Sequence, residues 1–327
     1  LILKLNVLKL IILYKNNNYY SLVYFTKFNY INITNIYEYF YMNIDIKGHS
    51  GCDIDIIEEN DKLIVRKSTS DIKYIKRLEL QGKKQANDKC LTDSISTPNI
   101  SKIESNENEC YILMDYIYAN NFIDYFEKAS PHDINNFIEN FITYINNEIN
   151  KCKLEKISKS VFIDKFNSVN NNCKNNELLK GNNRVKSILK DCENVFLNLP
   201  DKIEIPIGIC HGDLTFSNIL FASNKFYFID YLDSFIETPI QDIVKLRQDT
   251  KYFWSTMMYK KKYDRVRLNI IFDYIDSKID EYFGTYEYYY RTYDYLQLMN
   301  ILRILPYVKE EKIRDFVLNI LASLPKY

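Results

Sequence analysis

The stretch His211-Gly-Asp-Leu-Thr-Phe-Ser-Asn218, followed by Phe228-Ile-Asp-Tyr-Leu-Asp-Ser234, decides how this sequence is interpreted. It contains Asp213, then Asn218 five residues later, then Asp230 twelve residues beyond that. All three side chains carry oxygen atoms. Asp and Asn also favour turns, so the plain alternative is that Asp213 and Asn218 only cap turns. That alternative leaves the order of the residues unexplained.

Two short apolar runs, residues 219–222 and 225–229, lie between Asn218 and Asp230. Two such runs joined by a Ser-Asn turn predict a β-hairpin. A hairpin returns the chain to its starting point, so we expect Asp230 to lie close to Asn218 and Asp213. Phosphoryl transfer needs such a set, because a carboxylate must take the proton of the attacking hydroxyl and Mg²⁺ on the nucleotide phosphates needs oxygen ligands.

The pattern H-G-D-x-x-x-x-N followed by I-D-Y resembles the aminoglycoside phosphotransferase and choline kinase superfamily, small-molecule relatives of the protein kinases. Protein kinases carry H-R-D-x-x-x-x-N and D-F-G at the equivalent places. Here Gly212 replaces the Arg, Leu232 stands where D-F-G has its Gly, and no A-P-E follows. These departures favour the small-molecule branch.

The resemblance implies an α+β, bilobal protein-kinase-like fold. The N-lobe would be an antiparallel sheet with one helix, over residues 42–118, and would bind the nucleotide. The C-lobe, residues 119–327, would be mostly helical, would contain the catalytic hairpin and would bind the acceptor.

The resemblance also implies roles for the residues of the decisive stretch. Asp213 would act as the catalytic base, and His211 would brace the catalytic loop through hydrogen bonds. Asn218 and Asp230 would hold Mg²⁺ on ATP. Asp242 falls where the family has a buried Asp that supports the catalytic loop.

A second hairpin is predicted from residues 54–57 and 62–67, which flank a polar turn. Lys67 ends its second strand, where the resembled family has a lysine that contacts the α- and β-phosphates. A solvated lysine at a strand end is the plain alternative. Arg66 takes the role of Lys67 if the register shifts by one residue.

Gly48 and Gly51 form a glycine-rich turn just before this hairpin. Glycines allow the backbone to approach a phosphate closely, and Ser50 supplies a hydroxyl donor, so we expect Ser50 and Gly51 to bind the nucleotide. A tight turn without a ligand is the alternative. Further on, Met114 and Tyr116 fall where the family has the hinge whose backbone binds the adenine edge.

Residues 71–88 predict a helix, and the family usually supplies a Glu from this helix to hold the lysine. Glu79 is the only Glu in the segment, and Gln81 or Gln85 remains an alternative partner of Lys67. The sequence leaves this choice open.

Beyond residue 120 the periodicity of the apolar residues becomes helical. Residues 134–151 carry apolar side chains at a spacing that places them on one helix face. The segment 167–183 is low in apolar residues, and we expect a loop there. Further helices are predicted at residues 185–199, from 238 onward, and at 266–282, 286–305 and 310–324.

Composition excludes several classes of function. Lys and Arg total 43, as do Asp and Glu, so the net charge provides no general attraction to nucleic acid or to an anionic membrane. The seven cysteines include no C-x-x-C pair. We expect reduced thiols and a cytoplasmic protein, with no stable membrane association.

Residues 1–41 form a leader whose status the sequence leaves open. The first Met is Met42, and we expect translation to begin there. A peripheral helix and a membrane anchor are the alternatives. The apolar run at residues 1–13 is shorter than the roughly 20 residues that span a bilayer.

The acceptor is expected to bind near the C-terminal helices, as the resemblance implies. Tyrosines are dense over residues 282–295 and either line this pocket or lie on a helix surface. Lys and Arg outnumber Asp and Glu over residues 251–327, which favours a sugar or an amino alcohol over a polycationic aminoglycoside. The run at residues 300–307 is similar to family members associated with bacterial surface-polysaccharide genes.

The sequence therefore predicts an ATP-dependent small-molecule kinase that uses Mg²⁺ and phosphorylates a hydroxyl group. Two alternatives remain: a protein of the same fold that acts on a protein side chain, and a non-catalytic pseudokinase that only binds nucleotide. The acceptor's identity and the oligomeric state are beyond the sequence.

Overall fold

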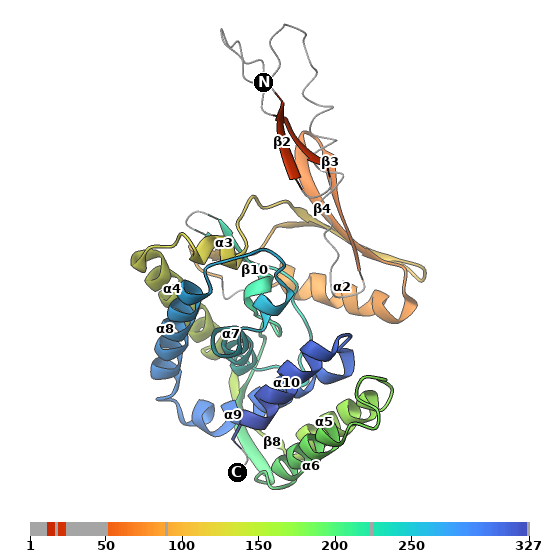
Figure 1. Cartoon of the computed structure of the whole chain (residues 1–327), viewed down its shortest axis with the longest axis vertical. Coiled ribbons are helices and arrows are strands. Elements are labelled where there is room, and N and C mark those ends of the chain that lie inside the picture. Colours follow the sequence, from red (N-terminus) through yellow and green to blue (C-terminus); the bar gives the residue numbers. More distant parts are fainter. Residues whose placement is uncertain (1–11, 17–18, 24–51, 89–90, 223–224, 326–327) are drawn as a thin grey trace, which may run out of the picture.

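The computed structural model describes residues 12–16, 19–23, 52–88, 91–222 and 225–325 (Figure 1). Near the N-terminus, β1 (Ile12–Asn16) and β2 (Tyr19–Val23) pair as an antiparallel ribbon. Ser50 and Gly51, the expected phosphate-binding residues, lie outside the described residues.

The N-lobe is built on an antiparallel sheet whose strand order is β3-β4-β7-β6. These strands are β3 (Asp53–Glu59), β4 (Lys62–Thr69), β6 (Ile100–Ser105) and β7 (Cys110–Asp115). Helix α2 (Ile72–Ala86) begins at an Asp71 N-cap and packs Ile75 and Leu78 against Cys110 and Ile112 of the sheet. The predicted arrangement of an antiparallel sheet and one helix is confirmed.

The C-lobe is mostly helical, as predicted. Its helices are α3 (Phe122–Phe126), α4 (Pro131–Ile149), α5 (Ser160–Cys173), α6 (Asn183–Leu197), α7 (Ile240–Tyr252), α8 (Arg265–Phe283), α9 (Glu287–Leu302) and α10 (Glu311–Ser323), with short 3₁₀ turns η1 (Phe216–Asn218), η2 (Ser255–Met258) and η3 (Leu305–Tyr307). Figure 1 shows α7 in the middle of this lobe, and it packs against both α8 and α9.

Two small sheets complete the C-lobe. The predicted catalytic hairpin is present as β10 (Ile219–Ala222) and β11 (Lys225–Phe228), paired antiparallel. The short strand β5 (Ile95–Ser96) pairs in parallel with β11, so a segment that precedes residue 118 joins the C-lobe hairpin. The other sheet pairs β8 (Lys153–Ser158) with β9 (Lys202–Ile207).

The prediction of a loop at residues 167–183 is wrong over its first part, because α5 continues to Cys173. Phe162, Phe166, Val169 and Cys173 are buried at a spacing of three to four residues, which defines one apolar helix face. Half of that face precedes residue 167, so residues 167–183 by themselves contain too few apolar side chains to indicate a helix. Its Asn residues occupy the other, more exposed face.

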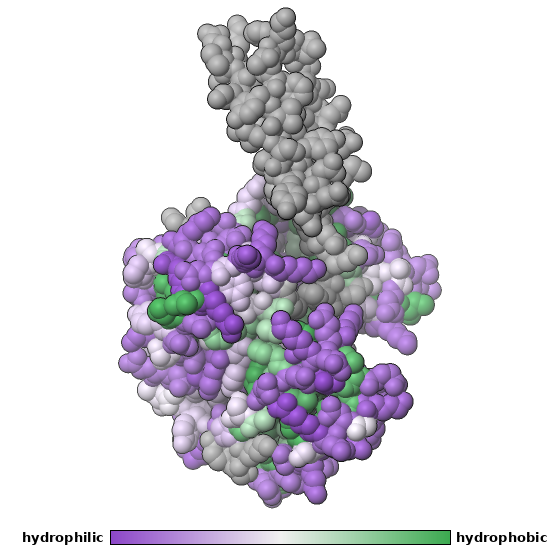
Figure 2. All heavy atoms as spheres, viewed as in Figure 1, coloured by the Kyte–Doolittle hydropathy of each residue, from purple (hydrophilic) through white to green (hydrophobic). Residues whose placement is uncertain are grey.

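On the face shown in Figure 2, hydrophilic residues cover most of the described surface, and hydrophobic residues form smaller patches. Over the described residues, we found no helix with both the length and the apolar content to cross a bilayer. None of the cysteines in this part of the chain forms a disulfide.

Candidate active site

The catalytic hairpin brings the two ends of the decisive stretch together. The Asn218 side-chain amide donates to the Asp213 main-chain carbonyl at 2.7 Å and to Asp213 Oδ2 at 3.1 Å. The Ile229 N–H donates to the Asn218 carbonyl at 3.0 Å, which closes the hairpin just before Asp230. The convergence expected from the sequence is therefore present in the structure.

Lys67 reaches this group from the N-lobe. Its ammonium lies 2.7 Å from Asp230 Oδ1, and the residue is only 4% exposed. Burial by itself lowers the pKa of Lys67, but the attraction to Asp230 and their hydrogen bond outweigh it, so the pKa is raised. Lys67 is therefore a buried cation whose charge depends on the carboxylate of Asp230.

Of the alternatives for this lysine, Arg66 points outward, stacks on the Tyr111 ring and lies 3.9 Å from Glu109. The register therefore selects Lys67, because successive side chains of a strand point to opposite faces.

None of the three candidate partners on α2 holds Lys67. Glu79 pairs with Lys76 and Lys83 of its own helix. The Gln81 amide donates to the Tyr74 hydroxyl at 3.2 Å, and the Gln85 amide donates to the Pro98 carbonyl at 3.3 Å. Among the described residues, the acidic partner of Lys67 is Asp230.

Two left-handed backbone positions shape the site. Gly212 has φ 89°, and a Cβ atom there would lie 2.1 Å from the Leu232 carbonyl oxygen. The Leu232 N–H in turn donates to the His211 carbonyl at 2.9 Å. Asp230 has φ 63°, which is rare for a residue with a side chain and occurs at functional sites. Gly212 is thus required for the close contact between the catalytic loop and the segment after Asp230.

His211 braces the loop as a neutral imidazole. It is fully buried, its Nε2 lies 2.8 Å from the Ile229 carbonyl, and its Nδ1 accepts the Asp213 N–H at 3.2 Å. Burial lowers the pKa of His211 to about 4. This arrangement requires the tautomer with hydrogen on Nε2 and leaves the ring no free nitrogen for proton transfer.

Helix α7 supports the catalytic loop with one row of charged side chains. Asp242 accepts the N–H groups of His211 at 2.6 Å and of Gly212 at 2.7 Å. Lys245 lies 2.9 Å from Asp213 Oδ1. Asp249 accepts the Phe216 N–H at 2.6 Å.

The expected supporting position of Asp242 is thus present, and burial raises its pKa to about 7. The sequence interpretation missed Lys245 and Asp249. The signal that would have found them is their spacing from Asp242, which places all three residues on one face of a helix.

The donors present fit Mg²⁺. One oxygen of Asp230 lies on Lys67, and the Asp230 side chain is one-third exposed. The Asn218 side chain donates through its amide nitrogen to Asp213, which leaves its amide oxygen for a metal. Mg²⁺ commonly takes one or two protein carboxylates and completes its shell with water and substrate phosphates. A cluster of three or more His, Cys, Asp or Glu side chains that could hold a metal is not found among the described residues.

The two expected hinge residues have different surroundings. Met114 is a buried residue of β7, paired with β4 and β6 within the sheet. The Tyr116 N–H donates to the Leu63 carbonyl at 3.2 Å, while Tyr116 itself lines a cavity of about 330 Å³. Residues 118–120, Phe221 and Ala222 complete the lining of this cavity.

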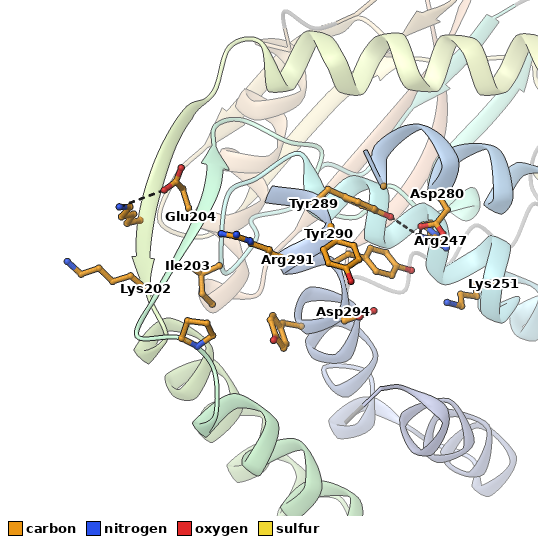
Figure 3. A pocket seen from close by; sticks show the side chains of 15 residues that line it. Lys202, Ile203, Glu204, Arg247, Lys251, Asp280, Tyr289, Tyr290, Arg291 and Asp294 are labelled. Carbon is orange, nitrogen blue, oxygen red and sulfur yellow. Dashed lines mark hydrogen bonds and ion pairs between the residues drawn. The ribbon is translucent and has the colours of Figure 1, made fainter. Parts of the chain in front are cut away.

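The tyrosine-rich segment lies at a different place from the catalytic loop. Tyr289, Tyr290, Tyr293 and Tyr295 line a cavity of about 910 Å³ between α7, α8, α9 and β9 (Figure 3). The Tyr289 hydroxyl accepts from Arg247 at 2.8 Å, and the Arg247 guanidinium lies over the Tyr293 ring.

None of the residues that line this cavity is among those around Asp213. Of the two alternatives for the tyrosines, the one in which they line the acceptor pocket is therefore not supported. Tyr289 and Tyr293 are core residues, and Tyr290 is exposed.

The fold and the site together define a protein of the bilobal kinase-like class. The model of the phosphotransferase enzyme family matches residues 172–274, a range that contains the catalytic loop, the hairpin and α7. The predicted resemblance to phosphotransferases is thereby confirmed over this range of residues. No curated protein sequence matches the chain significantly.

Solved structures of this class share the fold at low sequence identity. A Haemophilus somnus 129PT protein described as a fructosamine-3-kinase aligns with a TM-score of 0.52 and 14% identity, over 84% of this chain and 89% of that chain. A glucosamine kinase in complex with glucosamine, ADP and inorganic phosphate aligns with a TM-score of 0.51 and 9% identity, over 82% and 75%. An aminoglycoside phosphotransferase mutant with ADP and hygromycin B aligns with a TM-score of 0.51 and 9% identity, over 83% and 92%.

Proposed function

We propose that this protein is an ATP-dependent kinase that transfers the γ-phosphoryl group to a hydroxyl of a small molecule. The observation that carries the proposal is the joint placement of Asp213, Asn218, Asp230 and Lys67. A base, two metal ligands and a phosphate-binding cation are the parts that this reaction needs. The matched family model and the nucleotide complexes of similar structures support the same class of reaction.

In this proposal Asp213 orients the acceptor hydroxyl and receives its proton. The hydroxyl oxygen forms a bond to the γ-phosphorus, and the bond from the γ-phosphorus to the bridging oxygen breaks, with its electron pair leaving on ADP. Asn218 and Asp230 would hold Mg²⁺, which when bound neutralises charge on the phosphates. Lys67 would contact the α- and β-phosphates.

The adenine would bind in the cavity at Tyr116. Its lining joins the end of β7 to Phe221 and Ala222 of β10, so it connects the two lobes at the edge of the hairpin. Ser50 and Gly51 are proposed to cover the phosphates, as the sequence predicts. The lobe boundary near residue 118 also stays a prediction.

The test is ADP release in a screen of hydroxyl acceptors that includes sugars, choline, ethanolamine and aminoglycosides. We expect Asp213→Asn to abolish transfer while Mg-ATP still raises the melting temperature, because Asp213 acts on the acceptor. Asp230→Ala should remove both transfer and the stabilisation by Mg-ATP. Asp233→Asn, at an exposed residue of the same loop, is the matched control.

Unchanged transfer in both the Asp213 and Asp230 variants would overturn the proposal. A pseudokinase would show stabilisation by Mg-ATP with no transfer to any acceptor, small molecule or protein. The ordered Lys67–Asp230 pair and the intact catalytic loop favour the enzyme.

A further inference from the structure

Three cations that lack an acidic partner among the described residues come from α2, α5 and the end of α9, three elements that contact the segment after Asp230. Ser234 of that segment donates to the Gly212 carbonyl at 3.4 Å, next to Asp213. Arg303 follows the last turn of α9, Lys165 lies in α5 and Arg77 lies in α2. Among the described residues, each of these three side chains has no ion pair with a carboxylate, although Arg303 has a long contact of 3.4 Å with the Asn300 side-chain oxygen. They form what we call the cationic group.

The other lysines of the site differ from this group because each forms an ion pair with a carboxylate. Lys67 pairs with Asp230, Lys84 with Glu237 at 2.7 Å, and Lys245 with Asp213. Their positive charges are therefore already balanced within the protein. The charges of the cationic group are not balanced in this way.

The ring of Phe235 gives the cationic group its geometry. The Arg303 guanidinium lies 5.8 Å from the centroid of this ring, and Phe162 of α5 packs edge-on against the same ring at 5.7 Å. Lys165 is three residues after Phe162, so it lies on the same face of α5. Because α5 also packs against α9 and η3, Lys165 and Arg303 approach each other beside Phe235.

The pKa shifts of these side chains have the directions expected for burial and neighbouring like charges. Burial lowers the pKa of Arg303; attraction to Asp213 opposes this effect, and repulsion by Arg77 adds to it. Burial also lowers the pKa of Lys165, followed by repulsion from Arg303 and Arg77. Partly buried like charges raise the free energy of the protein unless an anion lies between them.

We propose that the acceptor carries an anionic group, a carboxylate or a phosphate, which Arg303 and Lys165 bind while its hydroxyl faces Asp213. This inference rests on the proposed function and narrows its substrate class. An arginine fork matches the planar carboxylate and the phosphate group, and the face of Phe235 suits the apolar side of a sugar ring. A polycationic aminoglycoside or a choline-type cation would be repelled by the same residues.

Arg77 belongs to the N-lobe, whereas Arg303 and Lys165 belong to the C-lobe. It lies on the exposed side of α2, with its guanidinium 5.3 Å from the centroid of the Tyr74 ring. Arg77 would add a charge from the N-lobe to the field around the anion, because it is coupled electrostatically to both Arg303 and Lys165.

The test compares sugars that differ in charge at one position: glucose, glucuronate, glucose 6-phosphate and glucosamine. Binding is measured by calorimetry with saturating Mg-ADP, and transfer by ADP release from ATP. We expect the anionic sugars to bind at least about tenfold more tightly than glucose, which corresponds to one good ionic contact. Glucosamine should bind more weakly than glucose.

Variants locate the effect. Arg303→Gln and Lys165→Gln should each remove most of the preference for anionic sugars, with binding of glucose and the KM for ATP unchanged. Arg303→Lys keeps the charge and should retain part of the preference. Lys186→Gln, at an exposed residue of the neighbouring helix α6, is the matched control. Melting temperatures of all variants identify any loss that arises from misfolding.

Equal or tighter binding of glucose or glucosamine would overturn the inference, as would failure of both anionic sugars to bind. A changed KM for ATP in Arg303→Gln would place this residue at the nucleotide instead and would also overturn it. Transfer to neutral sugars that depends on Asp213 would leave the proposed function standing while the inference fails. Transfer that survives Asp213→Asn would instead contradict the proposed function.

Discussion

At the scale of single residues, Asp213 is held from two directions. Lys245 lies 2.9 Å from Oδ1, and the Asn218 amide lies 3.1 Å from Oδ2. A carboxylate that is fixed at both oxygens has lost its rotational freedom before the acceptor binds. The reaction therefore does not have to include the loss of this rotational entropy. Lys245 is therefore a positioning residue for the proposed base.

Lys245→Met should lower kcat by about 10- to 100-fold, because it removes a fixed cation next to the reacting groups. The KM for ATP should change little, since Lys245 contacts Asp213 and not the proposed nucleotide site. Steady-state kinetics separate the two constants. Lys245→Arg should recover part of the activity, and Lys251→Met, on the same helix, should behave as the wild type. A loss confined to the KM for ATP would contradict this role.

His211 should make stability depend on pH in the acid range. Burial lowers the pKa of His211 in the folded state to about 4 from its ordinary value of 6.5, so the unfolded chain binds the proton first as the pH falls. Above pH 6.5 the ring is neutral in both states and the full contribution is present. As the pH falls from 6.5 to 4, the free energy of unfolding decreases by on the order of 3 kcal/mol.

Urea unfolding of the wild type and of His211→Gln across this range measures the effect. The difference in unfolding free energy between the two proteins should shrink as the pH falls from 6.5 to 4. Asp242 makes the unfolding free energy depend on pH in the opposite direction. Burial raises the pKa of Asp242 to about 7, so its contribution to stability is lost as the pH rises. It is present in both proteins, so it largely cancels in the difference. A constant difference would show that His211 is not buried as a neutral ring.

At the scale of elements, α7 organises the site. Asp242, Lys245 and Asp249 lie on one face and reach successive parts of the catalytic loop. On another face Arg247 pairs with Asp276 at 2.8 Å and also contacts Asp280, both in α8. Because α7 is held firmly by its neighbours, the side chains that it directs to the loop have fixed positions.

Asp249→Ala should destabilise the protein by about 3 kcal/mol. The Asp249 carboxylate accepts the Phe216 N–H at 2.6 Å, and the Ser255 N–H and hydroxyl at 2.7 and 2.9 Å. Its removal leaves buried donors unsatisfied, which typically costs about 1–3 kcal/mol for each group. Chemical denaturation at pH 7 measures the change. Asp273→Ala, at an exposed residue of α8, should change it by less than about 0.5 kcal/mol. Equal effects would refute a bracing role.

At the scale of the whole molecule, polar contacts connect the two lobes around the site. Lys67 reaches Asp230, and Lys84 donates to the Leu232 carbonyl and to Glu237, each at 2.7 Å. The Tyr231 hydroxyl donates to Asp88 at 2.5 Å. All of these contacts converge on the segment just after the hairpin, so the position of Asp230 depends on both lobes.

Lys84→Met should loosen this segment and raise the KM for ATP, because Asp230 follows its movement. Loss of hydrogen bonds that involve a charged group should also lower the unfolding free energy by about 2 kcal/mol. Kinetics and urea unfolding provide the two readouts. The control is Lys83→Met, since Lys83 is exposed on the same helix and pairs only with Glu79 there. If the two variants behave alike, the lobe contact at Lys84 does not control the site.

Features that depend on residues close together in the sequence could be predicted, whereas features that depend on distant residues could not. The β10–β11 and β3–β4 hairpins depend on neighbouring residues, and the sequence pattern predicts both correctly. The choice between Lys67 and Arg66 stayed open in the sequence, because it depends on the strand register. The end of helix α5, residues 167–173, was not predicted because half of its apolar face lies before residue 167, so these residues by themselves show too few apolar side chains.

The sequence by itself determined the catalytic loop, the hairpin and the order of the proposed site residues, because those depend on spacing along the chain. Tertiary structure alone decided that Lys67 pairs with Asp230, that Lys245 holds Asp213, and that Arg303 lies over the Phe235 ring. These contacts join residues from separate elements, and their distances follow from how helices and sheet pack. The tyrosine-rich segment shows the same limit, since only packing placed Tyr289 and Tyr293 against Arg247.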